Sequence, residues 1–213
     1  MKEFDYSVIK DSGFYDRARP FGKALGKLFY KVCYTGLENI PKEGGFILAS
    51  NHMCAMDPGY IGLAIEDRQI HFMGKKELFE KPIIGTFYRK LPGFPVNRGG
   101  AASRSVNYAI RLVKEGNIFG IFPEGTRSKD HRPGKARPGV AKIAMESHAD
   151  ILPVAVYNCD EMKKHTKVTI RFGKLIPYSE LGLTDESDKE ELKAAADLIM
   201  SRITALWEEG HCE

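Results

Sequence analysis

The chain has 213 residues, of which 43% are hydrophobic and 28% are charged, a balance that favours one globular domain and excludes a disordered chain. No segment approaches the roughly 20 consecutive apolar residues that a membrane-spanning helix needs. The first residues also lack the apolar stretch of a signal peptide. We therefore expect an uncleaved cytosolic protein.

Charge is distributed unevenly along the chain. Residues 179–213 hold ten acidic and three basic residues, a net charge of −7, so the overall charge of +4 leaves +11 on residues 1–178. A body this basic favours anionic partners, which include phosphorylated small molecules, lipid headgroups and nucleic acid. The sequence contains no helix-turn-helix, zinc finger or aromatic-rich RNA-binding strand, so we expect no nucleic-acid partner.

Cysteines and histidines show no metal-binding pattern. The four cysteines are Cys33, Cys54, Cys159 and Cys212. Without an export signal, their wide spacing favours reduced thiols over disulfides. Five histidines are scattered without metal-ligand spacing: His71, His131, His148, His165 and His211. We expect no bound metal.

The N-terminal region mixes apolar and basic residues. Over residues 14–34, aromatic and aliphatic side chains alternate with arginine and lysine, which predicts a basic amphipathic helix that Pro20 breaks or starts. Such a helix can lie in the interface of an anionic membrane. The alternative is a helix packed on the domain, and the periodicity does not decide between them.

The remaining chain alternates between strand and helix patterns. The short apolar run 46–49, after a Pro and Gly turn, predicts a buried strand. The other predicted strands are 70–73, 93–96, 117–122, 151–156 and 167–172. The predicted helices are 58–66, short ones within 76–90, 102–115, 138–148 and 186–209. This alternation is typical of an α/β fold with a mixed sheet.

A histidine and an aspartate stand five residues apart where the strand 46–49 gives way to a helix. A carboxylate bonded to one imidazole nitrogen fixes the tautomer and leaves the other nitrogen free to take a proton from a hydroxyl. His52 and Asp57 are therefore candidates for general-base catalysis on an alcohol. The alternative is that Asp57 only caps the helix.

Two basic segments follow strands. In the loop 122–128, Arg127 can bind phosphate oxygens in pairs, Glu124 can accept bonds from a polyol, and Gly125 permits close backbone approach. Arg98 precedes two glycines and a helix start that favours anions, and Lys75 follows the predicted strand 70–73. The alternatives are a polar turn and solvated surface charges.

In this order, the segments resemble the motifs of the 1-acylglycerol-3-phosphate acyltransferases, part of the wider glycerolipid acyltransferase group. The motif NHxxxxD is matched by 51–57, the arginine motif by 93–98, FPEGTRS by 122–128, and a strand with proline flanked by aliphatic residues by 151–156. The resemblance covers residues 20–176. It implies a glycerol-3-phosphate acyltransferase-like fold, with a mixed, mostly parallel sheet flanked by helices.

The resemblance also implies a reaction and site roles. His52, oriented by Asp57, would deprotonate the free hydroxyl of lysophosphatidate, which attacks an acyl thioester directly and gives phosphatidic acid. Substrate-binding roles fall on six residues, with the glycerol at Glu124 and Gly125 and the phosphate at the basic ones: Lys75, Arg98, Glu124, Gly125, Thr126 and Arg127. Independently of the resemblance, the amphipathic pattern predicts that residues 1–35 form a membrane-surface segment, which leaves residues 36–213 as the catalytic domain.

The implied partners are lysophosphatidate, an acyl-coenzyme A or acyl carrier protein thioester as co-substrate, and an anionic membrane surface. No other cofactor is expected. The chain would bind peripherally at the cytoplasmic face of the cell membrane. Three alternatives stay open: another lysophospholipid as acceptor, glycerol 3-phosphate as acceptor, and a non-catalytic lipid-binding role. Cys54 stands where the family often has serine, so a thiolate nucleophile is a further hypothesis.

Overall fold

The computed structural model describes residues 4–9, 11–29, 31–96, 102–159 and 166–212, with only the backbone described for 25–29, 102 and 103. Its strands are β1 (Lys31–Thr35), β2 (Phe46–Ser50), β3 (Ile70–Lys75), β4 (Phe94–Val96), β5 (Ile118–Ile121), β6 (Ile151–Tyr157) and β7 (Lys167–Phe172). Its α-helices are α1 (Gly13–Phe29), α2 (Asp57–Ala64), α3 (Lys76–Glu80), α4 (Ile84–Tyr88), α5 (Ala102–Lys114), α6 (Gly139–Ser147) and α7 (Lys189–Glu208). Two 3₁₀ turns, η1 (Leu37–Asn39) and η2 (Tyr178–Leu181), complete the chain.

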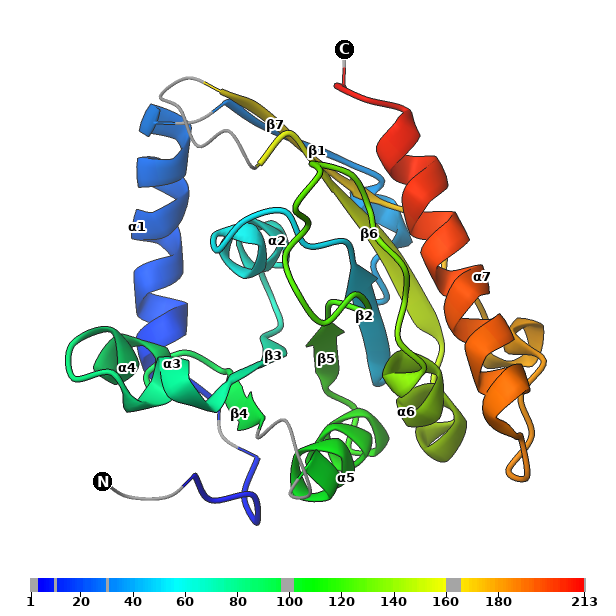
Figure 1. Ribbon diagram of the computed structural model, residues 1–213. Coiled ribbons are helices and arrows are strands. Elements are labelled where there is room, and N and C mark those ends of the chain that lie inside the picture. The colour runs from blue at the N-terminus through cyan, green and yellow to red at the C-terminus, as the bar shows by residue number, and fades with distance from the viewer. Residues whose placement is uncertain (1–3, 10, 30, 97–101, 160–165, 213) are drawn as a thin grey trace.

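The seven strands form one sheet in the order β1-β7-β6-β2-β5-β3-β4. Five neighbouring pairs are parallel and only β6 and β7 run antiparallel. The predicted mixed, mostly parallel sheet flanked by helices is therefore confirmed (Figure 1). Because β6, β2, β5, β3 and β4 all run the same way, the residues that follow them emerge at one edge of the sheet.

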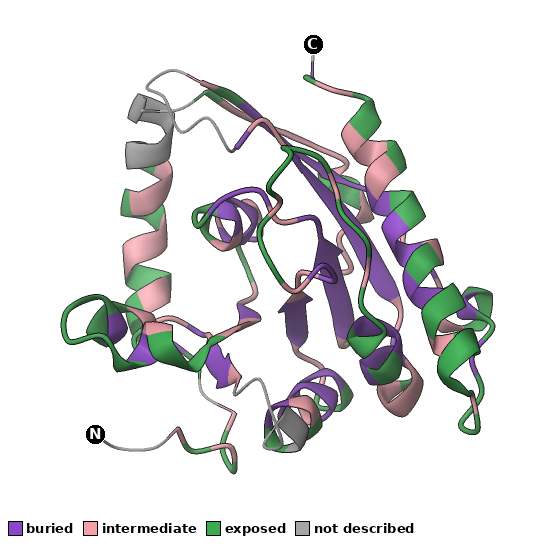
Figure 2. Ribbon diagram, viewed as in Figure 1, coloured by how far each residue is buried: buried purple, intermediate pink, exposed green. Residues whose placement is uncertain are grey.

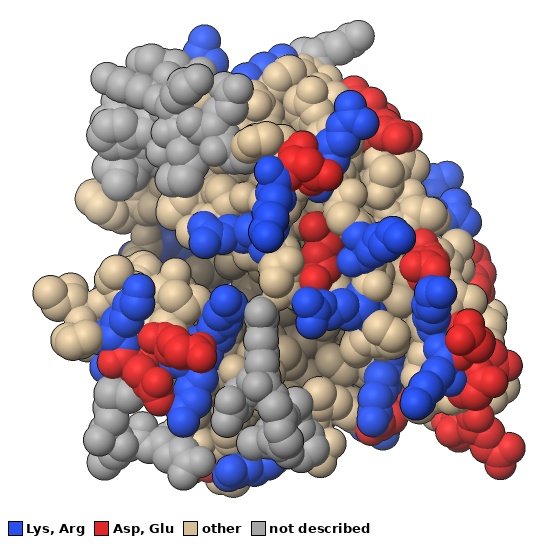
Figure 3. Space-filling model, viewed as in Figure 1, with Lys and Arg blue, Asp and Glu red and all other residues tan. Residues whose placement is uncertain are grey.

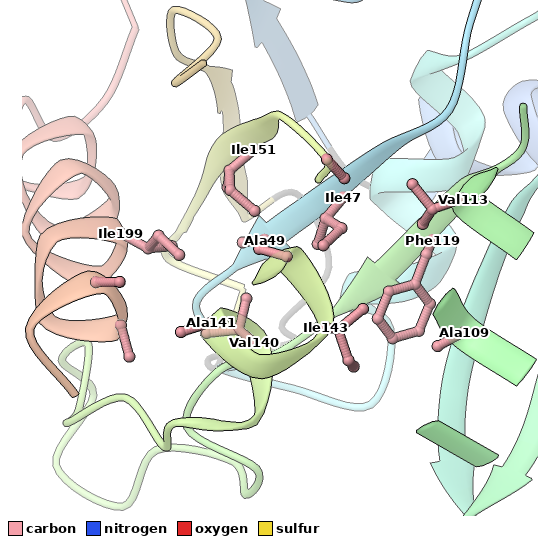
Figure 4. Packing of buried hydrophobic residues seen from close by; sticks show 14 of the residues in the cluster. Ile47, Ala49, Ala109, Val113, Phe119, Val140, Ala141, Ile143, Ile151 and Ile199 are labelled. Carbon is pink, nitrogen blue, oxygen red and sulfur yellow. The ribbon is translucent and has the colours of Figure 1, made fainter. Parts of the chain in front are cut away.

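Helices cover both faces of the sheet, and the strands beneath them consist mainly of apolar residues. Every residue of β2 is buried, as a continuous apolar run in a parallel sheet predicts. Its residues Ile47 and Ala49 pack toward α5, α6 and α7, whereas Phe46 and Leu48 pack toward α2. Figure 2 shows the buried sheet between these layers, and Figure 4 shows the packing of Ile47 and Ala49 against helix residues such as Val140 and Ile199.

The N-terminal region differs from the prediction in two ways. The predicted helix over 14–34 ends at Phe29, and residues 31–35 form β1, which pairs in parallel with β7. The apolar and β-branched residues there pair with a strand distant in sequence, which local periodicity cannot show. Residues 31–35 are thus part of the sheet, although the predicted N-terminal segment extends to residue 35. Pro20 lies inside α1 and costs one backbone bond, but it neither starts nor ends the helix.

Helix α1 is bonded to the domain along its inner side. Arg19 donates to the Ile65 and Arg68 carbonyls at 3.0 and 3.4 Å, and Gln69 donates to Asp16 at 2.7 Å. The outer side of α1 exposes Phe21, with 70% of its surface accessible. Among the described residues, no helix combines the length and the apolar character needed to cross a membrane.

Cys33 and Cys212 form a disulfide, so the prediction of four reduced thiols is wrong for this pair. A separation of 179 residues gives no sign that the C-terminal tail returns to β1. The tail is held there by a bond from the Cys212 amide to the Thr169 hydroxyl at 3.2 Å and by Lys167 at the Cys212 carbonyl. Cys54 and Cys159 are free, as predicted.

Buried His71 in β3 should make the stability of the fold depend on pH. Burial lowers the pKa of His71 below its ordinary 6.5, although Asp11 and a bond to the Pro92 carbonyl act the other way. Its Nε2 atom is buried without a partner among the described residues, so a proton there would find no acceptor. The folded chain thus keeps His71 neutral while the unfolded chain takes up a proton near pH 6.5.

We therefore expect the free energy of unfolding to fall as the pH drops below 6.5, with a contribution from His71 of up to about 1.4 kcal/mol per pH unit. Urea unfolding of the native chain and of His71→Asn, followed from pH 7.5 to 5.5, measures this contribution as the difference between the two slopes. Parallel curves for the two proteins would contradict it.

Candidate active site

His52 is positioned by the residue that precedes it. The buried Asn51 side chain donates to the Val156 carbonyl at 2.9 Å and accepts from the Val156 amide at 2.8 Å. Asn51 thus extends the pairing of β2 with β6 by one residue through its side chain. His52 therefore leaves the carboxyl end of β2 in a defined direction, a role for the asparagine that the sequence did not predict.

The predicted dyad forms. His52 Nδ1 lies 2.7 Å from Asp57 Oδ2, and the same oxygen accepts from the amides of Met53 and Cys54 at 2.7 and 2.9 Å. Asp57 is fully buried, whereas the His52 side chain is 19% exposed. Three donors on one oxygen hold the carboxylate in place, so it fixes the imidazole with Nε2 turned away from it. No described residue is bonded to Nε2, which can accept a proton.

Aromatic rings hold the face of the imidazole. The Phe122 ring stacks on the His52 ring with centroids 4.0 Å apart, and Phe72 stacks on Phe122 at 5.5 Å. Gly120 in β5 makes room for this stack, since a Cβ there would lie 2.5 Å from the Phe72 ring. The stack thus depends on a glycine in a strand interior, a position where glycine often marks close packing.

Glu124 braces the loop that carries the histidine. Its Oε1 accepts from the His52 amide at 2.9 Å and its Oε2 from the Gly134 amide at 3.1 Å. The Ser128 amide donates to the His52 carbonyl at 2.7 Å, and Arg137 Nε donates to the Glu124 carbonyl at 3.2 Å. Glu124 therefore ties the ends of β2 and β5 together through its carboxylate.

Burial sets the electrostatics of this brace. Glu124 is 7% exposed, and this burial raises the pKa of its carboxyl, while the bonds from the His52 and Gly134 amides act in the opposite direction. The two amide donors favour the ionised form, because a carboxylate accepts charge-assisted bonds at both oxygens. The remaining lone pairs leave room for one more donor, such as a substrate hydroxyl.

Three other predicted ligands lie at this edge of the sheet. Lys75 ends β3 and is exposed, as are Thr126 and Arg127 in the loop after β5. Gly125 adopts the left-handed conformation with φ of 70°, which turns the loop after Glu124. Arg98 lies outside the described residues. Figure 3 shows lysine and arginine side chains gathered around a hollow on this face.

The thiolate hypothesis for Cys54 finds little support. Cys54 is 5% exposed, and its sulfur accepts a bond from the Met56 amide at 3.3 Å. The nitrogen of His52 that faces this loop, Nδ1, is already bonded to Asp57. Cys54 thus belongs to the buried support of the dyad.

Two cavities of the described residues lie away from the dyad. One, of about 600 Å³, is lined by the disulfide Cys33–Cys212 and Arg171. The other, of about 280 Å³, lies at the amino ends of β3 and β5 beside Gln69 and Asn117.

The chain is similar to known proteins in sequence and in fold. A family model described as Acyltransferase matches residues 31–157. The 1-acyl-sn-glycerol-3-phosphate acyltransferase of Bacillus subtilis (strain 168) is 36% identical over 172 residues, which cover 79% of this chain and 84% of the relative. The enzyme of the same name from Borreliella burgdorferi is 35% identical over 131 residues, 60% of this chain and 52% of the relative. The crystal structure of the 1-acyl-sn-glycerophosphate acyltransferase PlsC from Thermotoga maritima superposes with a TM-score of 0.69 at 26% identity, covering 94% of this chain and 85% of that one.

Proposed function

Since the chain belongs to the acyltransferase family, we propose that it transfers a fatty acyl group from a thioester to the free sn-2 hydroxyl of 1-acyl-sn-glycerol 3-phosphate, giving phosphatidic acid. The observation that carries this proposal is the His52–Asp57 pair at the carboxyl edge of the sheet, 2.7 Å apart. The names of the relatives supply the acceptor, and the basic residues of the same edge suit its phosphate.

The geometry supports a direct transfer. The acceptor hydroxyl lies at His52 Nε2, which takes its proton as the oxygen attacks the thioester carbonyl. The new C–O bond forms, the C–S bond breaks, and the departing thiolate receives the proton from the imidazolium. Asp57 stabilises the imidazolium between these steps. No acyl-enzyme is formed, and we propose no cofactor beyond the thioester.

Arg127 and Lys75 are the described candidates for the acceptor phosphate. Both are exposed at the carboxyl edge that also carries His52. Arginine can grip two phosphate oxygens at once, whereas lysine adds a point charge. Glu124 contributes chiefly by positioning His52, as its two backbone bonds indicate.

We further propose that the chain docks peripherally on an anionic bilayer, at the cytoplasmic face of the cell membrane. α1 and α4 together expose a group of apolar side chains, here called the apolar patch: Phe14, Phe21, Ile83, Ile84 and Phe87. The rings of Phe14 and Phe87 lie 6.3 Å apart, so the two helices contact each other. Figure 1 shows α4 beside α1. Exposed Arg17, Lys81 and Lys90 border the patch and would meet anionic headgroups.

Charge introduced into the patch should release the chain from membranes. Ile83 is 86% exposed and Phe87 52% exposed, so aspartate at both positions should leave the fold intact. Burying one such side chain contributes about 1.5–3 kcal/mol. We expect the doubly substituted chain to bind vesicles of anionic phospholipid at least tenfold more weakly in a sedimentation assay. Leu37→Asp, at an exposed apolar residue outside the patch, is the matched control, and equal losses in both proteins would contradict the docking proposal.

The reaction is tested by release of free thiol from long-chain acyl-coenzyme A and from acyl carrier protein thioesters, with and without lysophosphatidate. Release that requires lysophosphatidate, with phosphatidic acid as the product, supports the proposal. Release with another lysophospholipid or glycerol 3-phosphate alone would overturn the acceptor. If no pair of donor and acceptor reacts, the protein is a lipid-binding module instead.

A further inference from the structure

Two free cysteines lie beneath the dyad. Cys54 follows β2 and Cys159 follows β6, and they are 5% and 1% exposed. The bonds between Asn51 and Val156 bring the two chain segments together, and each cysteine comes three residues later. The two sulfur atoms and a carboxylate oxygen of Asp57 all lie within 4.8 Å of one another.

The two oxygens of the Asp57 carboxylate differ in their hydrogen bonds. Asp57 Oδ2 accepts three bonds, but Oδ1 is buried without a hydrogen-bond partner among the described residues. A buried carboxylate oxygen without a donor is costly, so it favours a group that can share its charge. The Met56 amide donates to Cys54 Sγ, and this hydrogen bond fixes the position of the sulfur atom.

We propose that Cys54, Asp57 and Cys159 form a binding site for a thiophilic divalent cation such as Zn²⁺ or Cd²⁺, and that this cation inhibits the enzyme. Thiolates prefer such soft ions, and bonds of about 2.3 Å to sulfur and 2.0 Å to oxygen require ligand atoms about 3.5–4 Å apart. The observed group satisfies this with a small closure. Each thiol releases one proton to water as one cation binds, and a water molecule completes the coordination.

Inhibition follows from the shared carboxylate, and this part rests on the proposed function. A cation on Oδ1 withdraws charge from Asp57, so the carboxylate stabilises the His52 imidazolium less.

Binding is measured directly, through the ultraviolet charge-transfer absorption of Cd²⁺ thiolate bonds and by calorimetry, without added reductant so that the disulfide Cys33–Cys212 stays closed. We expect one Cd²⁺ per chain, and Cys54→Ser and Cys159→Ser should each lose the absorption. Cys33→Ser, in the distant disulfide, should keep it. Absorption that survives in both Cys54→Ser and Cys159→Ser would overturn the site, whatever the catalytic activity of the preparations.

Inhibition is measured on thiol release, with each protein compared with its own metal-free rate. We expect Cys54→Ser and Cys159→Ser to need at least tenfold more Cd²⁺ for half inhibition, and a chelator to restore the native rate. Serine is common in the family at the position of Cys54, so Cys54→Ser should fold normally. The result for Cys54→Ser therefore tests the site even if Cys159→Ser folds poorly. Inhibition that is equal in all three proteins would overturn the proposed effect on the dyad.

Discussion

His52→Ala should lower kcat for acyl transfer by about 10³-fold or more while the fold is retained. Positioned general bases contribute about 10²–10⁴-fold, and this one is aligned by a buried carboxylate with three donors. A 10³-fold loss corresponds to about 4 kcal/mol of transition-state stabilisation. Steady-state thiol release with saturating lysophosphatidate measures the loss, and circular dichroism checks the fold.

The matched control is His148→Asn. His148 ends α6 in the left-handed conformation with φ of 51°, where asparagine is tolerated, and its side chain is 56% exposed beside Asp185. It should transfer acyl groups at the native rate. A His52→Ala variant that retains more than a tenth of the native kcat would show that His52 is not the base. The hypothesis of a Cys54 thiolate nucleophile would then be favoured.

The order of strands and helices could be predicted because each element carries its own pattern. The buried run of β2 and the helical spacing in α5 are local signals, and both elements lie where predicted. The dyad was also predictable, since its two residues are five apart and one turn brings them together. In these cases the decisive interactions lie within a few residues of one another in the sequence.

What escaped prediction depends on contacts between distant segments. The pattern of residues 31–34 predicts helix, and only the pairing of β1 with β7 makes this segment a strand. The disulfide Cys33–Cys212 and the approach of Cys159 to Cys54 require knowledge of which strands are neighbours. The position of the Glu124 carboxylate likewise depends on β5 lying beside β2. A sequence motif can identify a residue such as Glu124, but the order of strands in the sheet determines which residues it contacts.

Glu124→Gln should lower kcat by about 10- to 100-fold and leave the KM for lysophosphatidate nearly unchanged. The carboxylate accepts from two backbone amides, whereas a carboxamide can accept at only one side and presents an N–H group to the other amide. Losing one charge-assisted bond costs about 1.5–3 kcal/mol. This loss loosens the segment that carries His52, which acts on the chemical step and not on acceptor binding.

The split between kcat and KM separates the brace from the alternative inferred from family resemblance, in which Glu124 holds the glycerol hydroxyl. A direct substrate contact would appear as a raised KM at a nearly native melting temperature. A brace lowers the melting temperature by several degrees together with kcat. Glu115→Gln, at an exposed partner of Arg111 on α5, removes the same charge without touching the site and should change neither quantity. A raised KM as the sole effect of Glu124→Gln would show that the carboxylate acts on the substrate, and that the backbone bonds alone do not define its role.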